Sequence, residues 1–87
     1  MSTKNVDIWP AQCRAGRALL EITQSDLAAL AGLGLSTVVD FEKGRRQVSI
    51  EAVREIREAL TRAGVEFIDE NGGGPGVRLR KRQQKRG

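Results

Sequence analysis

Hydrophobic positions recur every three or four residues through most of the chain, which is the period of an amphipathic helix. This period predicts four helices, at residues 10–21, 24–31, 35–43 and from residue 50 to the glycine at 64. The predicted apolar face of the second helix consists of Leu27, Ala28, Leu30 and Ala31, and that of the fourth consists of Ile50, Val53, Ile56 and Leu60. Gly16 interrupts the first helix at a cost of about 1 kcal/mol relative to alanine, which indicates close packing there.

Local signals mark where these helices begin and end. Thr23 followed by Asp26 has the pattern of a capping box, in which a hydroxyl and a carboxylate satisfy early backbone N–H groups. Ser49 is placed to cap the fourth helix in the same way. Gly32 and Gly44 are expected to end the second and third helices in the left-handed conformation that glycine adopts without strain.

After residue 64 the period of the apolar positions changes to two, which is the period of a β-strand. The two strand-like runs are residues 65–68 and 77–80, and the segment DENGGGPG between them is a strong turn signal. We expect Val65 and Phe67 to share one face with Val77 and Leu79. An isolated two-stranded hairpin is marginal in water, so this one must pack either on the helices or on a second subunit.

Very little chain separates the second predicted helix from the third. The glycine stop of the second helix is followed only by Leu33 and Gly34. A turn this short lets one helix brace the next at a steep angle, so that the braced helix projects from the body. The major groove of B-DNA, about 12 Å wide, admits such a helix. The residues expected to face outward are Leu35, Ser36, Thr37, Val39 and Asp40, while Val38 and Phe41 would hold the helix to the core.

Composition excludes several kinds of chemistry. The 87 residues suit one domain, 39% of them are hydrophobic, and there is one cysteine and no histidine. The chain therefore lacks the ligands of a nitrogen–sulfur metal site, an intramolecular disulfide and the commonest general base. We expect no enzyme activity, no metal or other cofactor and no small-molecule substrate. No apolar run approaches the roughly 20 residues that cross a bilayer, so we expect a soluble, cytoplasmic protein without a membrane partner.

The net charge of +4 is unevenly distributed. Residues 72–87 hold six basic side chains and no acidic one, whereas the preceding part of the chain has more acidic than basic residues. A basic tail is therefore attached to a nearly neutral body.

On these residues the chain resembles the phage-repressor-like helix-turn-helix family, the Cro and xenobiotic-response-element type of regulator. The positions that carry the resemblance are Arg17, Gln24, Leu27, Ala28, Gly32, Ser36, Val38 and the closing FEKG at 41–44. The resemblance implies a mainly α fold of four or five helices, here followed by a short C-terminal β-hairpin or strand pair. The resemblance covers about residues 12–60 and assigns residues 1–64 to a DNA-binding domain. The pattern of the remaining residues predicts a strand pair at 65–80, which is a candidate for dimerisation, and a flexible basic tail at 81–87.

The resemblance also implies roles for single residues. Base edges would be read by Leu35, Ser36, Thr37, Val39 and Asp40, and the DNA backbone would be held by Gln24, Ser25, Lys43, Arg45 and Arg46. Arg17 and Glu42 match a partly buried pair that joins the first and third helices. Leu35 departs from the polar residues usual in the family and offers only apolar contact, for instance to a thymine methyl group. Asp40 either accepts a hydrogen bond from cytosine, or excludes wrong sequences or turns toward Lys43 or Arg45.

One module of this size buries limited DNA surface, so the expected form is a homodimer bound to an inverted repeat. A DNA-binding protein of this kind is expected in the cytoplasm, associated with the nucleoid. The expected dimer contacts are Val65, Phe67, Ile68, Val77 and Leu79, with the exposed part of the fourth helix as the alternative. The tail residues Arg78, Arg80, Lys81 and Arg82 either contact DNA or only add solubility and nonspecific binding.

The expected function is sequence-specific regulation of transcription, as a repressor or autoregulator of a mobile element or small operon. Two other functions remain open. One is an antitoxin or antiactivator that works by binding a protein partner, and the other is nonspecific packaging of nucleic acid through the tail.

Overall fold

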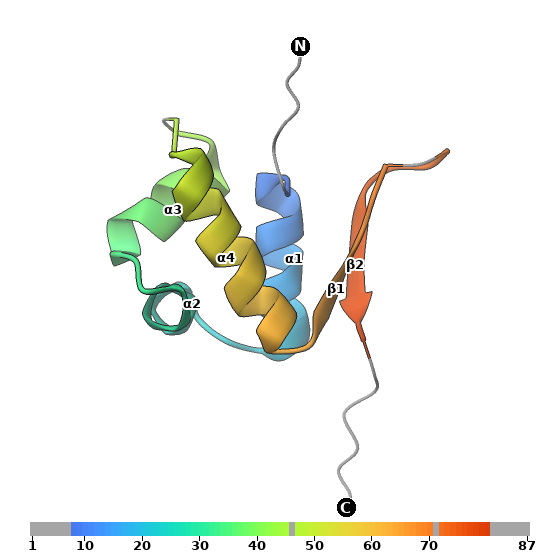
Figure 1. Cartoon of the computed structure of the whole chain (residues 1–87), viewed down its shortest axis with the longest axis horizontal. Coiled ribbons are helices and arrows are strands. Elements are labelled where there is room, and N and C mark those ends of the chain that lie inside the picture. The colour runs from blue at the N-terminus through green and yellow to red at the C-terminus, as the bar shows by residue number, and fades with distance from the viewer. Residues whose placement is uncertain (1–7, 46, 71, 81–87) are drawn as a thin grey trace, which may run out of the picture.

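The computed structural model describes residues 8–45, 47–70 and 72–80, which contain four helices and two strands. The elements are α1 (Pro10–Leu20), α2 (Gln24–Ala31), α3 (Leu35–Lys43), α4 (Ile50–Arg62), β1 (Val65–Ile68) and β2 (Gly76–Leu79) (Figure 1). The expected mainly α fold with a C-terminal strand pair is confirmed. The second strand begins one residue earlier than predicted and ends at Leu79, so Arg80 lies outside it.

The predicted helix caps are present. The Thr23 hydroxyl accepts a hydrogen bond from the Asp26 N–H at 2.9 Å, and the Asp26 carboxylate accepts one from the Thr23 N–H at 3.0 Å. The Ser49 hydroxyl accepts a hydrogen bond from a backbone N–H in the first turn of α4 at 3.1 Å. Gly32, with φ of 69°, and Gly44, with φ of 62°, end α2 and α3 in the left-handed conformation.

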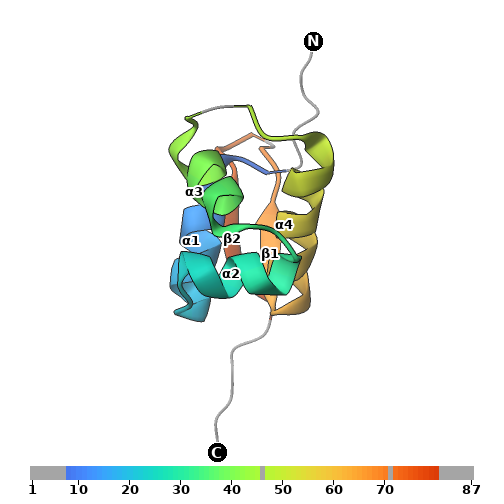
Figure 2. The same cartoon turned by 90° about the vertical axis from the view of Figure 1, so that its left-hand side faces the viewer.

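The four helices enclose one hydrophobic core. α1 and α4 lie on either side of it, while α2 and α3 cover one end and cross each other steeply (Figures 1 and 2). The fully buried side chains include Leu27, Val38 and Ile56, one from each of α2, α3 and α4.

Two residues of the predicted apolar faces lie outside this core. Leu30 is 51% exposed and Ile50 is 50% exposed. α2 is short, and Leu27 with its alanine neighbours already fills the side that faces the other helices. Ile50 is the first residue of α4, and Ala52 and Val53 occupy the core positions at that end. Helical spacing therefore overestimated the width of both apolar faces.

β1 and β2 form the predicted hairpin, and the structure gives its antiparallel register. Val65 lies opposite Leu79, and Phe67 lies opposite Val77. Val65 is fully buried, and Phe67 and Val77 pack against the same core as the helices, so the helical body is the packing partner of the hairpin. Val65, one of the expected dimer contacts, is enclosed within its own chain and offers no exposed surface to a second subunit.

Gln12, a residue without a predicted role, ties α1 to the hairpin. Its side-chain oxygen accepts a hydrogen bond from the Trp9 N–H at 2.8 Å. Its amide nitrogen donates to the carbonyl of Gly76 at 3.0 Å and, more weakly, to that of Ile68 at 3.4 Å. One buried amide therefore caps the start of α1 and anchors the hairpin to it.

Alanine substitutions at two glycines test the packing. A Cβ added at Gly16 would lie 3.5 Å from Leu60 and 3.6 Å from Val65, which is ordinary van der Waals contact. Gly16→Ala should therefore raise the free energy of unfolding by up to about 1 kcal/mol, because alanine is the better helix former.

Gly32→Ala is the matched control. The same methyl group would meet open space, but φ is +69° there, so the variant should lose about 1 kcal/mol of stability. Urea unfolding of both variants measures the two effects. Destabilisation by Gly16→Ala would show that the α1 to α4 contact has no room for a methyl group.

Candidate nucleic-acid interface

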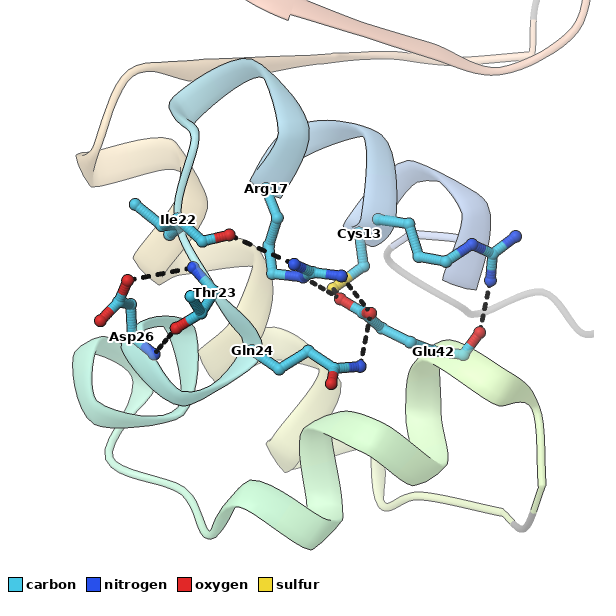
Figure 3. Close-up of polar contacts among 8 residues, drawn as sticks. Cys13, Arg17, Ile22, Thr23, Gln24, Asp26 and Glu42 are labelled. Carbon is cyan, nitrogen blue, oxygen red and sulfur yellow. Dashed lines mark hydrogen bonds and ion pairs between the residues drawn. The ribbon is translucent and has the colours of Figure 1, made fainter.

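Glu42 lies on the inner side of α3 and is almost completely buried, with 2% of its surface exposed. Arg17 of α1 binds it with two hydrogen bonds, from Nε to Oε2 at 2.7 Å and from Nη2 to Oε1 at 2.8 Å (Figure 3). This bidentate geometry is the strongest form of arginine–carboxylate contact. The pair between the first and third helices is therefore present.

Two more side chains donate to the same carboxylate. The Cys13 thiol of α1 donates to Oε2 at 3.0 Å, and the Gln24 side-chain amide of α2 donates to Oε1 at 3.0 Å. These four side chains, Glu42, Arg17, Cys13 and Gln24, are called the Glu42 network below. Because its members come from α1, α2 and α3, one carboxylate holds three helices together.

The network determines the charge of its members. Burial alone raises the pKa of Glu42, because a buried carboxylate has lost its hydration. The hydrogen bonds from Arg17, Cys13 and Gln24 outweigh this effect and hold the pKa of Glu42 below its ordinary value of 4.5. Burial, followed by the hydrogen bond to Glu42, raises the pKa of the Cys13 thiol. At neutral pH Glu42 is therefore ionised and Cys13 is a neutral hydrogen-bond donor.

The first turn of α3 is exposed to solvent. Leu35 is 47% exposed and Ser36 is also exposed, whereas Thr37, Val39 and Asp40 are half-buried. Of the five residues predicted to read bases, two are therefore exposed and three are half-buried. In Figure 1 the N-terminal end of α3 lies at the left-hand edge of the molecule, on the side away from the hairpin.

Asp40 turns toward Arg45, which is one of the roles that the sequence left open. Its Oδ1 lies 3.6 Å from Nη1 of Arg45, whose side chain is 58% exposed. An ion pair this long at the surface adds little stability.

The predicted backbone contacts lie at the two ends of the helix pair. Ser25 is exposed in the first turn of α2, and Lys43 and Arg45 are exposed at the end of α3. Gln24 is half-buried and donates to Glu42, so it braces α3 through the network. Arg46 lies outside the described residues.

The arginines of the hairpin make contacts within the chain. Nε of Arg78 lies 2.5 Å from Oε1 of Glu66 on the neighbouring strand. The Arg80 guanidinium donates twice to the carbonyl of Thr61, at 2.9 and 3.2 Å. The hairpin and α3 lie on opposite sides of the molecule (Figure 1), so Arg78 does not join the α3 surface. Lys81 and Arg82 lie outside the described residues.

No role was predicted for Cys13, which belongs to the Glu42 network, or for Arg14, which contacts the backbone of Glu42. Cys13 is four residues before Arg17, so helical spacing already placed both on one side of α1. Arg14 is exposed, and its Nη1 donates to the backbone carbonyl of Glu42 in the last turn of α3. No local signal indicated that contact.

Metal-binding clusters and membrane-spanning helices are absent from the part of the chain that the structure describes. There, no group of three or more His, Cys, Asp or Glu side chains is placed to hold a metal ion. None of the helices formed by these residues has the length and apolar character needed to cross a membrane.

A family model described as helix-turn-helix matches residues 14–66, which is more than half of the chain. The chain therefore belongs to the Cro/C1-type helix-turn-helix family, and it is a DNA-binding regulator of transcription. This is a family of regulatory domains and not of enzymes. A search of curated proteins found no match to the chain.

Acid titration tests the Glu42 network. Because the folded state lowers the pKa of Glu42, ionised Glu42 stabilises the fold above the ordinary pKa of 4.5, and this contribution is lost as the pH falls through the folded pKa. Glu42→Gln leaves Arg17 without its partner and should cost on the order of 3 kcal/mol at pH 7. The gap in unfolding free energy between wild type and variant should then shrink as the solution is acidified.

Urea unfolding from pH 7 to pH 3 measures this gap. Glu70→Gln, which changes an exposed glutamate beyond β1, is the control and should remain close to wild type throughout. A gap that stays constant over this range would contradict the assigned ionisation of Glu42.

Proposed function

We propose that this regulator binds an inverted-repeat operator as a homodimer and represses a small operon or mobile element, its own gene included. The observation that carries the proposal is the placement of α3. Its last turn is fixed by the Glu42 network, and Leu35 and Ser36 are exposed in its first turn. The protein would act on DNA in the cytoplasm, at the nucleoid.

In this proposal the N-terminal half of α3 reads bases in the major groove. Leu35 packs against a thymine methyl group, and the hydroxyls of Ser36 and Thr37 donate to or accept from base edges. Val39 adds apolar contact at the edge of the same surface. Asp40, held near Arg45, disfavours sequences that bring the acceptor atom of a base close to its carboxylate.

The contacts to the DNA backbone set the register of α3 in the groove. Ser25 lies at the N-terminus of α2, where exposed backbone N–H groups and the helix dipole favour a phosphate. Gln24 positions that end of α2, and Lys43, Arg45 and Arg46 supply positive charge after α3. Such contacts hold the protein in place without reading sequence.

The hairpin supports the proposal of a homodimer. Within the described residues the sheet has two strands, so β2 has a free edge that a second copy can extend. Ile68 is 38% exposed, and Phe67, Val77 and Leu79 are half-buried, which leaves them as the hairpin residues available to a partner. Two modules on half-sites one helical turn apart would supply the DNA surface that a single module lacks.

Footprinting on the DNA upstream of the protein's own gene tests this function. We expect one protected site with two-fold symmetry, whose half-sites lie about 34 Å apart, and we expect it to persist with weaker affinity at higher salt. Protection spread over the DNA, with no defined and symmetric site, would overturn the proposed operator and favour nonspecific packaging. No protection at any salt concentration would favour the protein-binding alternative.

Two alanine variants with the same chemical change separate the proposed roles. Ser36→Ala removes a base-reading hydroxyl and should change the preferred base at one position of each half-site, at a cost of about 1–3 kcal/mol for the original operator. Ser25→Ala removes a backbone contact and should weaken all sequences alike. Selection of bound duplexes from a random pool measures both. The same preferred sequence for Ser36→Ala and wild type would contradict the role of α3.

A further inference from the structure

Arg14 projects from α1 to the C-terminal end of α3. The residue is exposed, and Nη1 donates to the backbone carbonyl of Glu42. This contact holds the guanidinium beside the last turn of α3, at the residue that precedes Lys43 in the sequence. A residue from the first helix is therefore fixed at the end of the third.

The positive charge of Arg14 is not neutralised by this contact. A guanidinium has five N–H donors, and the carbonyl of Glu42 is a neutral acceptor that takes one of them. In the described part of the chain Arg14 pairs with no carboxylate. Arg17, by contrast, directs Nε and Nη2 to Glu42, so its charge is matched inside the protein.

The end of α3 carries more positive than negative charge. Lys43 and Arg45 are both exposed there, and among the described carboxylates Asp40 is the one recorded within ion-pair distance of Arg45. A helix in the major groove lies between two rows of phosphates, so cations at its end border one of these rows. Guanidinium groups match phosphate geometry well because their donors form a planar fork.

We propose that Arg14 binds a phosphate of the operator at the C-terminal end of α3, together with Lys43 and Arg45. This role rests on the proposed function and deepens it, because it adds a backbone contact from α1 to those of α2 and α3. The bond to the carbonyl of Glu42 orients Arg14 before DNA arrives, so little side-chain freedom is lost on binding.

The alternative role for Arg14 is purely structural, since a cation near the last carbonyls of a helix also stabilises that helix. Arg62 offers a matched comparison. It is an exposed arginine that donates to the carbonyl of Leu30 at 3.3 Å, in the last turn of α2, but it projects from the far end of α4. Arg14→Gln and Arg62→Gln therefore remove the same kind of helix-end contact.

The experiment measures the binding constant for the operator duplex between 50 and 300 mM KCl, with the full chain as wild type, Arg14→Gln, Arg14→Lys and Arg62→Gln. Each phosphate contact adds about 0.9 to the slope of log K against log salt. Because the homodimer makes this contact once in each half-site, Arg14→Gln should lower the slope by about 1.8 and weaken binding up to about sixtyfold at 0.1 M salt. The loss should be equal for a scrambled duplex, since a phosphate contact reads no sequence.

Arg14→Lys should restore the slope, and Arg62→Gln should leave it at the wild-type value. Thermal unfolding of each variant shows whether the fold is intact. An unchanged slope for Arg14→Gln, or an equal loss of slope for Arg62→Gln, would overturn the phosphate contact while leaving the proposed function in place. Absence of salt-dependent binding by the wild type itself would overturn the proposed function, and Arg14's role with it.

Discussion

The carboxylate of Glu42 is the constraint on which the arrangement of α1, α2 and α3 depends. A buried charge is costly unless hydrogen bonds and an opposite charge replace its hydration. Glu42 receives both hydrogen bonds of the Arg17 fork and one each from Cys13 and Gln24. Rotation of α3 about its axis would break these contacts together, so the network fixes which side of α3 faces the solvent.

The division of labour within α3 follows from this constraint. Val38, Phe41 and Glu42 are committed to the interior, and the residues at its outer side are free to vary with the DNA sequence to be read. The hairpin packs on the opposite side of the molecule through α1 and α4 (Figure 1). A second copy bound at the hairpin would therefore leave α3 unobstructed.

Much of this fold was predictable because its determinants are local. Caps such as Thr23 with Asp26, and stops such as Gly32, act within four residues of their partners, so the bounds of α2 and α3 agree with the pattern. Gln12 and Arg14 were not predictable in this way, because their partners lie 28 to 64 residues away along the chain. Helical spacing also cannot show how many apolar positions a neighbour covers, which is why Leu30 belongs to the predicted apolar face and yet is 51% exposed. In the site, the Arg17–Glu42 pair followed from the family resemblance, while the partner of Asp40 required the structure.

The central claim is that α3 enters the major groove with its N-terminal residues toward the bases. The most direct measurement is a set of intermolecular nuclear Overhauser effects between the labelled protein and an operator duplex. The account predicts nuclear Overhauser effects between the Leu35 methyl groups and major-groove protons such as thymine methyls. The methyl groups of the hairpin should show no such effect to the DNA. Contacts from Leu35 only to the minor-groove proton of adenine, or DNA contacts confined to the hairpin, would contradict it.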